Sequence, residues 1–119
     1  MTTVWVVEDD PDIADGCQLA LENAGFAVHL CRSGQQALAR IETQPAFDVV
    51  ILDLHLPGVG GEAVLSAIQN RWKKAKVFVA TADHLLAGIL ASQPQVCEAL
   101  VKPVGLKALV ELIWRYTSN

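Results

Sequence analysis

Basic residues are scarce in this sequence of 119 residues. It contains nine Lys and Arg against thirteen Asp and Glu, which gives a formal net charge of −4 at pH 7. A surface that binds nucleic acid needs clustered positive charge to neutralise the phosphates. The composition therefore argues against a nucleic-acid-binding surface within this domain.

Long hydrophobic runs are also missing. The apolar stretches are short and interrupted by charge, whereas a transmembrane helix needs about 20 consecutive apolar residues. The first apolar run, at residues 4–7, is followed at once by Glu8, Asp9 and Asp10, unlike the start of a secretory signal peptide. We therefore expect no membrane segment and a cytoplasmic location.

Cysteine is rare, and its three positions form no pattern. Cys17, Cys31 and Cys97 lack metal-ligand spacing and are odd in number. We expect them to be small buried hydrophobic residues in a reducing compartment.

Apolar residues, by contrast, are abundant. They make up 52% of the chain, and charged residues make up 18%. This balance is typical of a globular protein rather than a disordered one. A chain of this length can bury a substantial core, so we expect one domain covering residues 1–119.

The most informative stretch is DVVILDLHLPG, at residues 48–58. Its unbroken apolar run is typical of a strand buried on both faces, as in a parallel sheet covered by helices. Asp53 follows at the end of that strand, which is where ligands bind in open α/β sheets. A single Asp before a loop could equally well cap the turn. The residues that accompany it decide between these readings.

Strand and helix patterns alternate along the rest of the chain. Apolar and β-branched runs predict four further strands, at Thr3–Val7, 26–31, Lys76–Thr81 and 97–101. Apolar residues spaced three and four apart predict helices at 11–24, 33–44, 62–72, 83–92 and 105–116. This alternation indicates an α/β fold with one parallel sheet, right-handed crossovers and helices on both faces.

The same spacing predicts which side chains face the core. We expect Ile13 and Cys17 of the first helix and Leu106 and Leu109 of the last to point inward. His29 falls on the other face of the second strand from its apolar residues, and we expect it to be partly exposed at a sheet edge.

Polar residues lie where four of the expected strands end: Glu8, Asp9 and Asp10 after the first, Asp53 at the third, Thr81 at the fourth and Lys102 after the fifth. The carboxyl ends of parallel strands meet at one edge, so these residues converge on one pocket. Clustered carboxylates repel one another unless a cation lies among them, and a hard divalent ion such as Mg²⁺ suits such a set. With a lysine and a hydroxyl beside them, they suit phosphoryl transfer to a carboxylate.

This constellation strongly resembles the receiver domain of two-component response regulators, over the whole chain. The segments that match are VWVVEDDP, VVILDLHLPGVGG, VFVATA and VKP, in that order. Together the four motifs are specific, although each alone is weak. The resemblance implies a flavodoxin-like (βα)5 doubly wound sheet with strand order 2-1-3-4-5.

The resemblance also implies roles in phosphorylation and metal binding. Asp53 corresponds to the phosphoacceptor and Asp9 to a direct Mg²⁺ ligand. The backbone carbonyl of His55 and Asp53 itself complete the protein ligands, and Glu8 acts largely through water. Asp10 is expected to be a solvated neighbour.

Two further residues correspond to the family's switch and phosphate contact. Thr81 resembles the hydroxyl that moves to the phosphoryl group, and Lys102 resembles the lysine that contacts phosphate. The bond between Lys102 and Pro103 is expected to be cis. Ala99 departs from the family, which often has Tyr or Phe there, so coupling of an aromatic ring to Thr81 is in doubt.

Other departures concern the lifetime of the phosphoryl group and the output surface. His55 and Asp83 stand at positions that vary in the family and tune this lifetime. The helix expected at 83–92 is poor in charge, and with strand five and helix five it forms a face that many receivers use for output or dimerisation. Not all of its apolar residues can be buried, which suggests an exposed patch: Leu85, Leu86, Ile89, Leu90, Leu112 and Tyr116.

The resemblance favours a signalling module that takes a phosphoryl group from a histidine kinase or phosphotransfer protein and changes its binding surface. It would not be an enzyme beyond assisting its own phosphorylation and dephosphorylation. One alternative is a Mg²⁺-dependent phosphohydrolase working through an aspartyl-phosphate, but such enzymes usually place the nucleophile after the first strand and carry a cap. The other is a receiver-like interaction module without phosphorylation, which Ala99 favours and the intact Asp53, Asp9, Thr81 and Lys102 disfavour.

Overall fold

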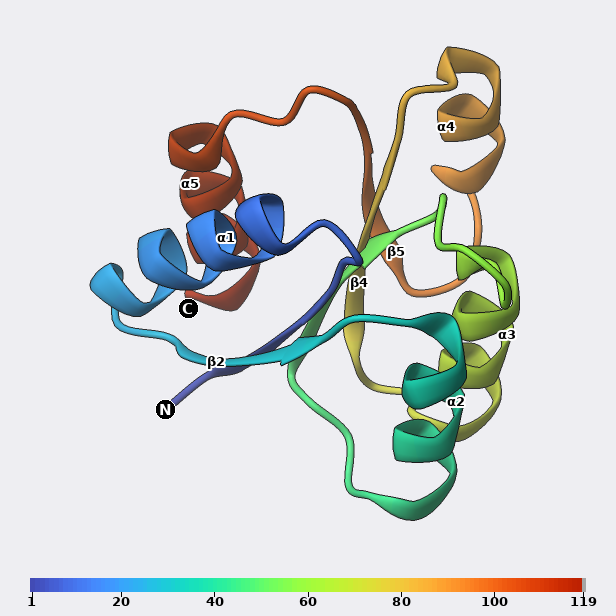
Figure 1. Cartoon of the computed structure of the whole chain (residues 1–119). Helices are drawn as coiled ribbons and strands as arrows, with labels where there is room; N and C mark the ends of the chain where they lie inside the picture. Colours follow the sequence, from blue (N-terminus) through green and yellow to red (C-terminus); the bar gives the residue numbers. More distant parts are fainter. Residues whose placement is uncertain (119) are drawn as a thin grey trace.

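Five parallel strands form the central sheet of the computed structural model, which describes residues 1–118 (Figure 1). Their order across the sheet is β2-β1-β3-β4-β5, which confirms the predicted topology. The strands are β1 (Thr3–Val7), β2 (Ala27–Cys31), β3 (Val49–Asp53), β4 (Lys76–Thr81) and β5 (Val96–Val101).

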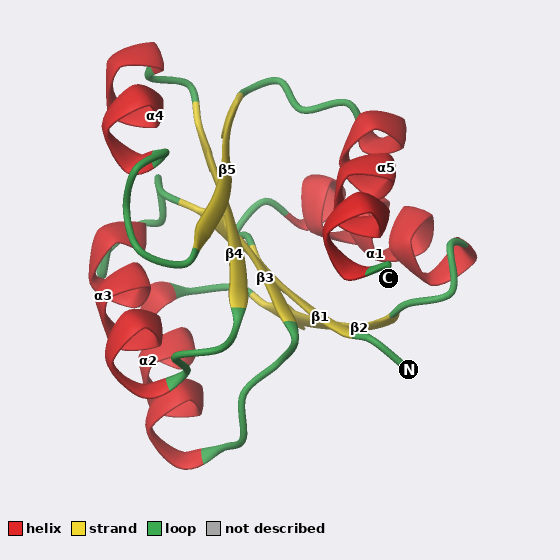
Figure 2. Ribbon diagram, turned by 180° about the vertical axis from the view of Figure 1, so that it is seen from behind, coloured by secondary structure: helices red, strands yellow, loops and turns green. Residues whose placement is uncertain are grey.

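Five helices cover the two faces of the sheet. Helices α1 and α5 lie on one face, and α2, α3 and α4 lie on the other (Figures 1 and 2). Their bounds are α1 (Pro11–Asn23), α2 (Gly34–Thr43), α3 (Gly61–Arg71), α4 (His84–Leu90) and α5 (Leu106–Thr117). Within residues 1–118, no helix combines the length and the hydropathy needed to cross a bilayer.

The sheet separates two hydrophobic clusters. One packs β-strand side chains against α2, α3 and α4, and the other packs them against α1 and α5. All five residues of β3 are buried, as its unbroken apolar run predicts. Cys17 and Cys31 are buried free thiols, as expected, whereas Cys97 is only partly buried. The sheet thereby fixes Asp53, the last residue of β3, in a rigid frame.

Side-chain caps begin three of the helices at the carboxyl edge of the sheet. Asp10 accepts hydrogen bonds from the N–H groups of Asp12 and Ile13 (2.9 and 3.3 Å) and so caps α1, rather than being only the solvated neighbour that we expected. Ser33 caps α2, as its sequence spacing predicts. Asp83 caps α4, and the helix is shorter at both ends than the helix expected at 83–92.

Two residues expected in the core lie at the surface instead. The side chains of Ile13 and Leu106 are 47% and 39% exposed. Both lie in the first turn of their helices and border an apolar cavity of about 410 Å³ between α1, α5 and the sheet. Helical spacing correctly places them on the inward side, but the packed core does not extend as far as these first turns.

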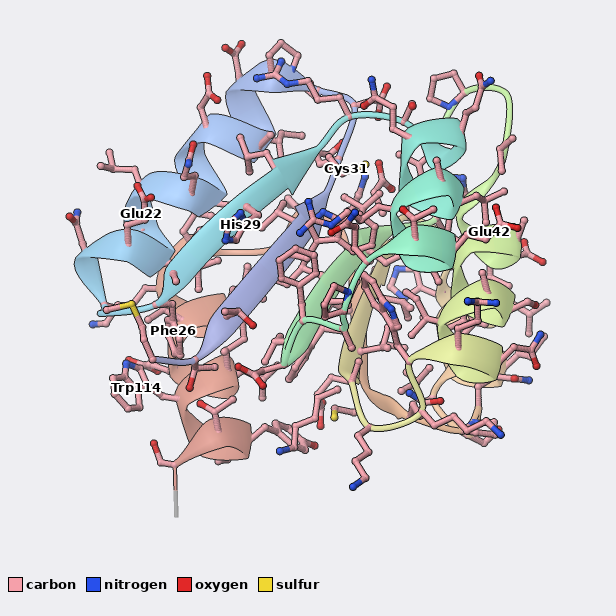
Figure 3. The ribbon with its side chains drawn as sticks, turned by 90° about the horizontal axis from the view of Figure 1, so that it is seen from below. Glu22, Phe26, His29, Cys31, Glu42 and Trp114 are labelled. Carbon is pink, nitrogen blue, oxygen red and sulfur yellow. The ribbon has the colours of Figure 1, made fainter. Side chains whose placement is uncertain are left out.

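His29 is an exposed residue of edge strand β2, as predicted (Figure 3). Its ring packs beside Phe47, with the ring centroids 5.2 Å apart. The patch predicted on α4 is also present in part, since Leu85 and Ile89 are 78% and 56% exposed, whereas Leu90 is buried.

Candidate acidic site at the carboxyl edge of the sheet

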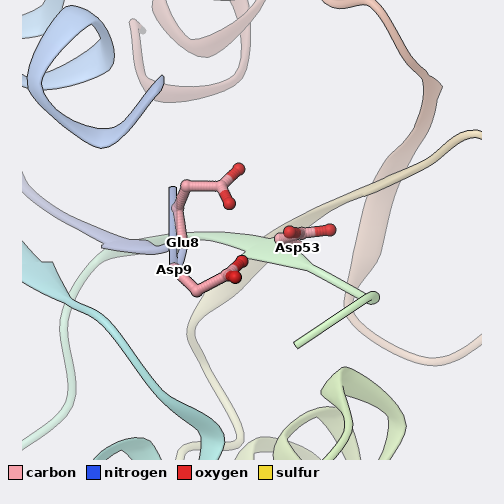
Figure 4. A group of neighbouring side chains, drawn as sticks. All are labelled: Glu8, Asp9 and Asp53. Carbon is pink, nitrogen blue, oxygen red and sulfur yellow. The ribbon is translucent and has the colours of Figure 1, made fainter. Parts of the chain in front are cut away.

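Three carboxylates from two neighbouring strands meet at this edge. Glu8 and Asp9 follow β1, and Asp53 ends β3 (Figure 4). Strands β1 and β3 pair directly, with Val7 opposite Leu52, so the residues that come next lie side by side. One oxygen of each carboxylate lies within 4.8 Å of the others. The predicted convergence of these three acids is therefore present.

Asp53 is an ionised carboxylate held by specific hydrogen bonds. It is 4% exposed, and its Oδ1 accepts bonds from Lys102 Nζ at 2.9 Å and from the backbone N–H of His55 at 3.1 Å. Burial raises the pKa of Asp53, but the hydrogen bonds from Lys102, His55 and Glu8 outweigh burial, so the net shift is downward. Asp53 therefore carries its charge at neutral pH and has Lys102 as its fixed cationic partner.

Glu8 has the opposite electrostatic character. It is 6% exposed, and its Oε2 accepts a bond from the N–H of Asp10 at 3.2 Å, while Lys102 Nζ lies 4.0 Å from Oε1. Burial raises the pKa of Glu8 to about 7, and its hydrogen bond and repulsion with Asp53 act in the same direction. Asp9 is exposed to solvent. The two neighbouring acids thus differ in environment, since Glu8 is buried and Asp9 is exposed.

Replacement of Glu8 should change how stability depends on pH. The raised folded-state pKa means that Glu8 contributes stability that is complete below its ordinary value of 4.5 and is lost as the pH rises to about 7. In metal-free protein, wild type should lose on the order of 2–3 kcal/mol of unfolding free energy relative to Glu8→Gln between pH 5 and 8. Urea unfolding in EDTA measures this difference. Parallel profiles for the two proteins would contradict the raised pKa.

The loop after Asp53 is held close to β3 by a glycine. A Cβ on Gly61 would lie 2.5 Å from the Cα of Leu54 and 2.6 Å from the carbonyl oxygen of Asp53, so no other residue fits without movement. Gly58, with φ of +73°, provides the turn just before it. These glycines bring the start of α3 against the strand that carries Asp53.

Thr81, the residue predicted to move to the phosphoryl group, is hydrogen-bonded to the side chain of His55 in this structure. It is completely buried at the end of β4, which pairs with β3. Its Oγ1 lies 2.7 Å from Nε2 of His55 and accepts a bond from the N–H of Asp83 at 3.1 Å. The sequence predicted a metal-binding role for the backbone carbonyl of His55 and an influence of this position on phosphoryl lifetime, but it did not predict this side-chain contact with Thr81. No spacing rule reveals it, because it joins the loop after β3 to the end of β4, and these segments are 26 residues apart in the sequence.

The donor set fits a small hard cation. Three carboxylate oxygens lie close together. Among the residues described, Lys102 is the only lysine or arginine paired with them. Negative charge at the site is therefore not fully compensated. Mg²⁺ prefers a few carboxylates and completes its shell with water. The bond between Lys102 and Pro103 is cis, as the resemblance implies.

Comparisons with known proteins agree on one family. The sequence pattern of the response regulator receiver domain matches residues 4–114. The chain is 32% identical over 117 residues to the DNA-binding transcriptional regulator NtrC of Salmonella typhimurium, covering 98% of this chain and 25% of that protein. The chain thus spans a quarter of the length of this relative.

Solved structures give the same result. A CheY-like receiver domain from Methanospirillum hungatei superposes with a TM-score of 0.85 at 25% identity, covering 98% of this chain and 93% of the other. The response regulator TrrA of Thermotoga maritima, solved in complex with Mg(2+)-BeF, has a TM-score of 0.82 at 29% identity and coverages of 97% and 98%.

Proposed function

Because this chain belongs to the response regulator receiver domains of two-component signalling systems, we propose that it accepts a phosphoryl group on Asp53. The observation that carries this proposal is the state of Asp53: buried, ionised and bonded to Lys102, with Glu8 and Asp9 beside it. A carboxylate whose pKa is low is available as a nucleophile at neutral pH.

In the proposed reaction, a carboxylate oxygen of Asp53 attacks phosphorus. The new O–P bond forms as the bond from phosphorus to the donor breaks, and the donor keeps that electron pair. Lys102 turns from the carboxylate to an oxygen of the arriving phosphoryl group, with which it forms a charge-assisted hydrogen bond. Thr81 donates its hydroxyl proton to another phosphoryl oxygen.

Four groups would hold Mg²⁺ in this proposal. Asp9, Asp53 and the carbonyl of His55 are the direct ligands, and Glu8 acts through water. When bound, the ion neutralises negative charge on the phosphoryl oxygens. The similar protein TrrA was solved in complex with Mg(2+)-BeF, which supports Mg²⁺ as the ion of this site.

We infer that the phosphoryl donor is a histidine kinase or a phosphotransfer protein, since both supply two-component receivers. In this proposal α4, β5 and α5 form the output face. The exposed Leu85 and Ile89 of α4 provide apolar surface there for a second copy or a downstream partner. In this proposal residues 1–119 act as one receiver domain, and that domain is a signalling module rather than an enzyme with a separate substrate.

The test is phosphorylation by a small donor. Incubation with acetyl phosphate and Mg²⁺ should add one phosphoryl group per chain, which intact mass spectrometry detects. EDTA should suppress the addition, because without Mg²⁺ the carboxylates would repel the anionic donor with no cation to screen their charge. Equal labelling with and without EDTA would show that Glu8, Asp9 and Asp53 do not work through a metal. No labelling under any condition would favour an interaction module that is not phosphorylated.

A further inference from the structure

The exposed side chain of His55 contacts the buried hydroxyl of Thr81, the residue predicted to respond to phosphorylation. Thr81 is completely buried, and Nε2 of His55 lies 2.7 Å from its hydroxyl oxygen. Among residues 1–118, this imidazole is the one side chain bonded to that hydroxyl. The two residues come from the ends of neighbouring strands, since β3 pairs with β4 up to Asp53 and Ala80.

A hydroxyl has a single proton to donate. The oxygen of Thr81 already accepts the N–H of Asp83 at 3.1 Å. If Thr81 donates its hydroxyl proton to Nε2 of His55, it cannot donate that proton to a phosphoryl oxygen on Asp53 until this hydrogen bond breaks. His55 and the phosphoryl group would then compete for the same proton.

Strand β5 does not offer a ring for this purpose. In the pairing of β4 with β5, Ala99 lies opposite Val79, and Val101 lies opposite Thr81. Because Val79 and Thr81 are two residues apart in one strand, Ala99 lies on the same face of the sheet as Thr81. Its side chain is a methyl group. The ring bonded to Thr81 comes instead from the loop after β3.

We propose that His55 is a positioning residue: its Nε2 accepts the hydroxyl proton of Thr81 and holds this side chain away from the phosphoryl site until phosphorylation replaces the bond. This inference rests on the proposed function, because it takes Asp53 as the phosphoacceptor. The switch is then a hydrogen-bond exchange at Thr81 rather than the movement of a ring from β5.

The exchange reaches α4 through one residue. Asp83 donates its N–H to Thr81, and its carboxylate accepts the N–H groups of Leu85 and Leu86 at 3.0 and 3.1 Å. Movement of the Thr81 hydroxyl therefore strains or breaks a bond at the cap of α4. The exposed Leu85 lies in this first turn, so the output face is coupled to His55.

The affinity for beryllofluoride, which mimics a phosphoryl group on a carboxylate, tests the competition. In His55→Ala the competitor is gone, so binding in saturating Mg²⁺ should tighten by roughly threefold to tenfold, the net effect of one hydrogen bond. His55→Phe keeps a ring without the nitrogen and should tighten binding similarly. His29→Ala removes an exposed imidazole from β2 and should change nothing. An unchanged or weaker affinity in His55→Ala, or wild-type affinity in His55→Phe, would overturn the proposal.

Two further measurements separate this inference from the proposed function. In a Thr81→Val background, His55→Ala should no longer change the affinity, because the shared bond is absent. In the unmodified protein, nitrogen NMR should show Nε2 of His55 without a proton, with a resonance that shifts in Thr81→Val. A protonated Nε2 would overturn the competition while leaving phosphorylation of Asp53 intact. Failure of wild type to bind beryllofluoride at all would overturn the proposed function, and this inference with it.

Discussion

Asp53→Asn should remain folded and lose phosphorylation by acetyl phosphate completely. The amide has nearly the shape of the carboxylate but is not a nucleophile, so no O–P bond can form. In the wild-type protein, Asp53 accepts hydrogen bonds from Lys102 and from the N–H of His55. The Asn side chain keeps an amide oxygen that can accept the same bonds. Intact mass after incubation with acetyl phosphate and Mg²⁺ measures the loss.

The matched control for this variant is Asp12→Asn. Asp12 is an exposed acid in the first turn of α1, outside the acidic cluster. Asp12→Asn should be labelled like wild type, and circular dichroism should show that both variants fold. Labelling of Asp53→Asn at the wild-type level would remove Asp53 from the mechanism.

Asp9→Asn should weaken Mg²⁺ binding far more than Glu8→Gln does. Loss of a residue that acts through water costs about 10- to 100-fold in metal affinity, and loss of a direct ligand should cost more still. Asp9 is exposed and open to an ion from solvent, whereas Glu8 is buried and its pKa of about 7 leaves it partly protonated at neutral pH. Calorimetric titration with Mg²⁺ at pH 8, where Glu8 is ionised, compares the two variants.

Asp15→Asn provides the control for the metal titration. Asp15 is a surface acid of α1 that pairs with Arg32 at 3.6 Å, so the variant should bind Mg²⁺ like wild type. Equal affinities for Asp9→Asn and Glu8→Gln would contradict the assignment of one direct and one water-mediated ligand. A larger loss for Glu8→Gln would exchange the two roles.

The sequence predicts the sheet and the acidic cluster well because both follow from short-range patterns. A run of four apolar residues before Asp53 is enough to place a buried strand, and all its residues are buried in the structure. Strand ends in a parallel sheet share one edge, so Glu8, Asp9 and Asp53 are expected at the same edge, and they meet there because β1 and β3 are neighbours. The order of the strands came from the family resemblance.

Features that depend on three-dimensional packing were not predictable in this way. Helical periodicity gives the direction of Ile13 and Leu106 but not that the first turns of α1 and α5 border a cavity. The bond between His55 and Thr81 depends on the path that the loop after β3 takes past the end of β4. Asp10 could have been recognised as a cap, because an Asp before Pro at the first helical position is a known start signal.

The central claim is that Asp53 carries the phosphoryl group, and locating that group on the wild-type protein tests it most directly. Borohydride reduction converts an aspartyl phosphate to homoserine, which peptide mass spectrometry can place in the sequence. After incubation with acetyl phosphate and Mg²⁺, we expect homoserine at position 53 and nowhere else. Reduction at position 8 or 9, or a phosphoryl group retained on a histidine such as His55, would contradict the claim.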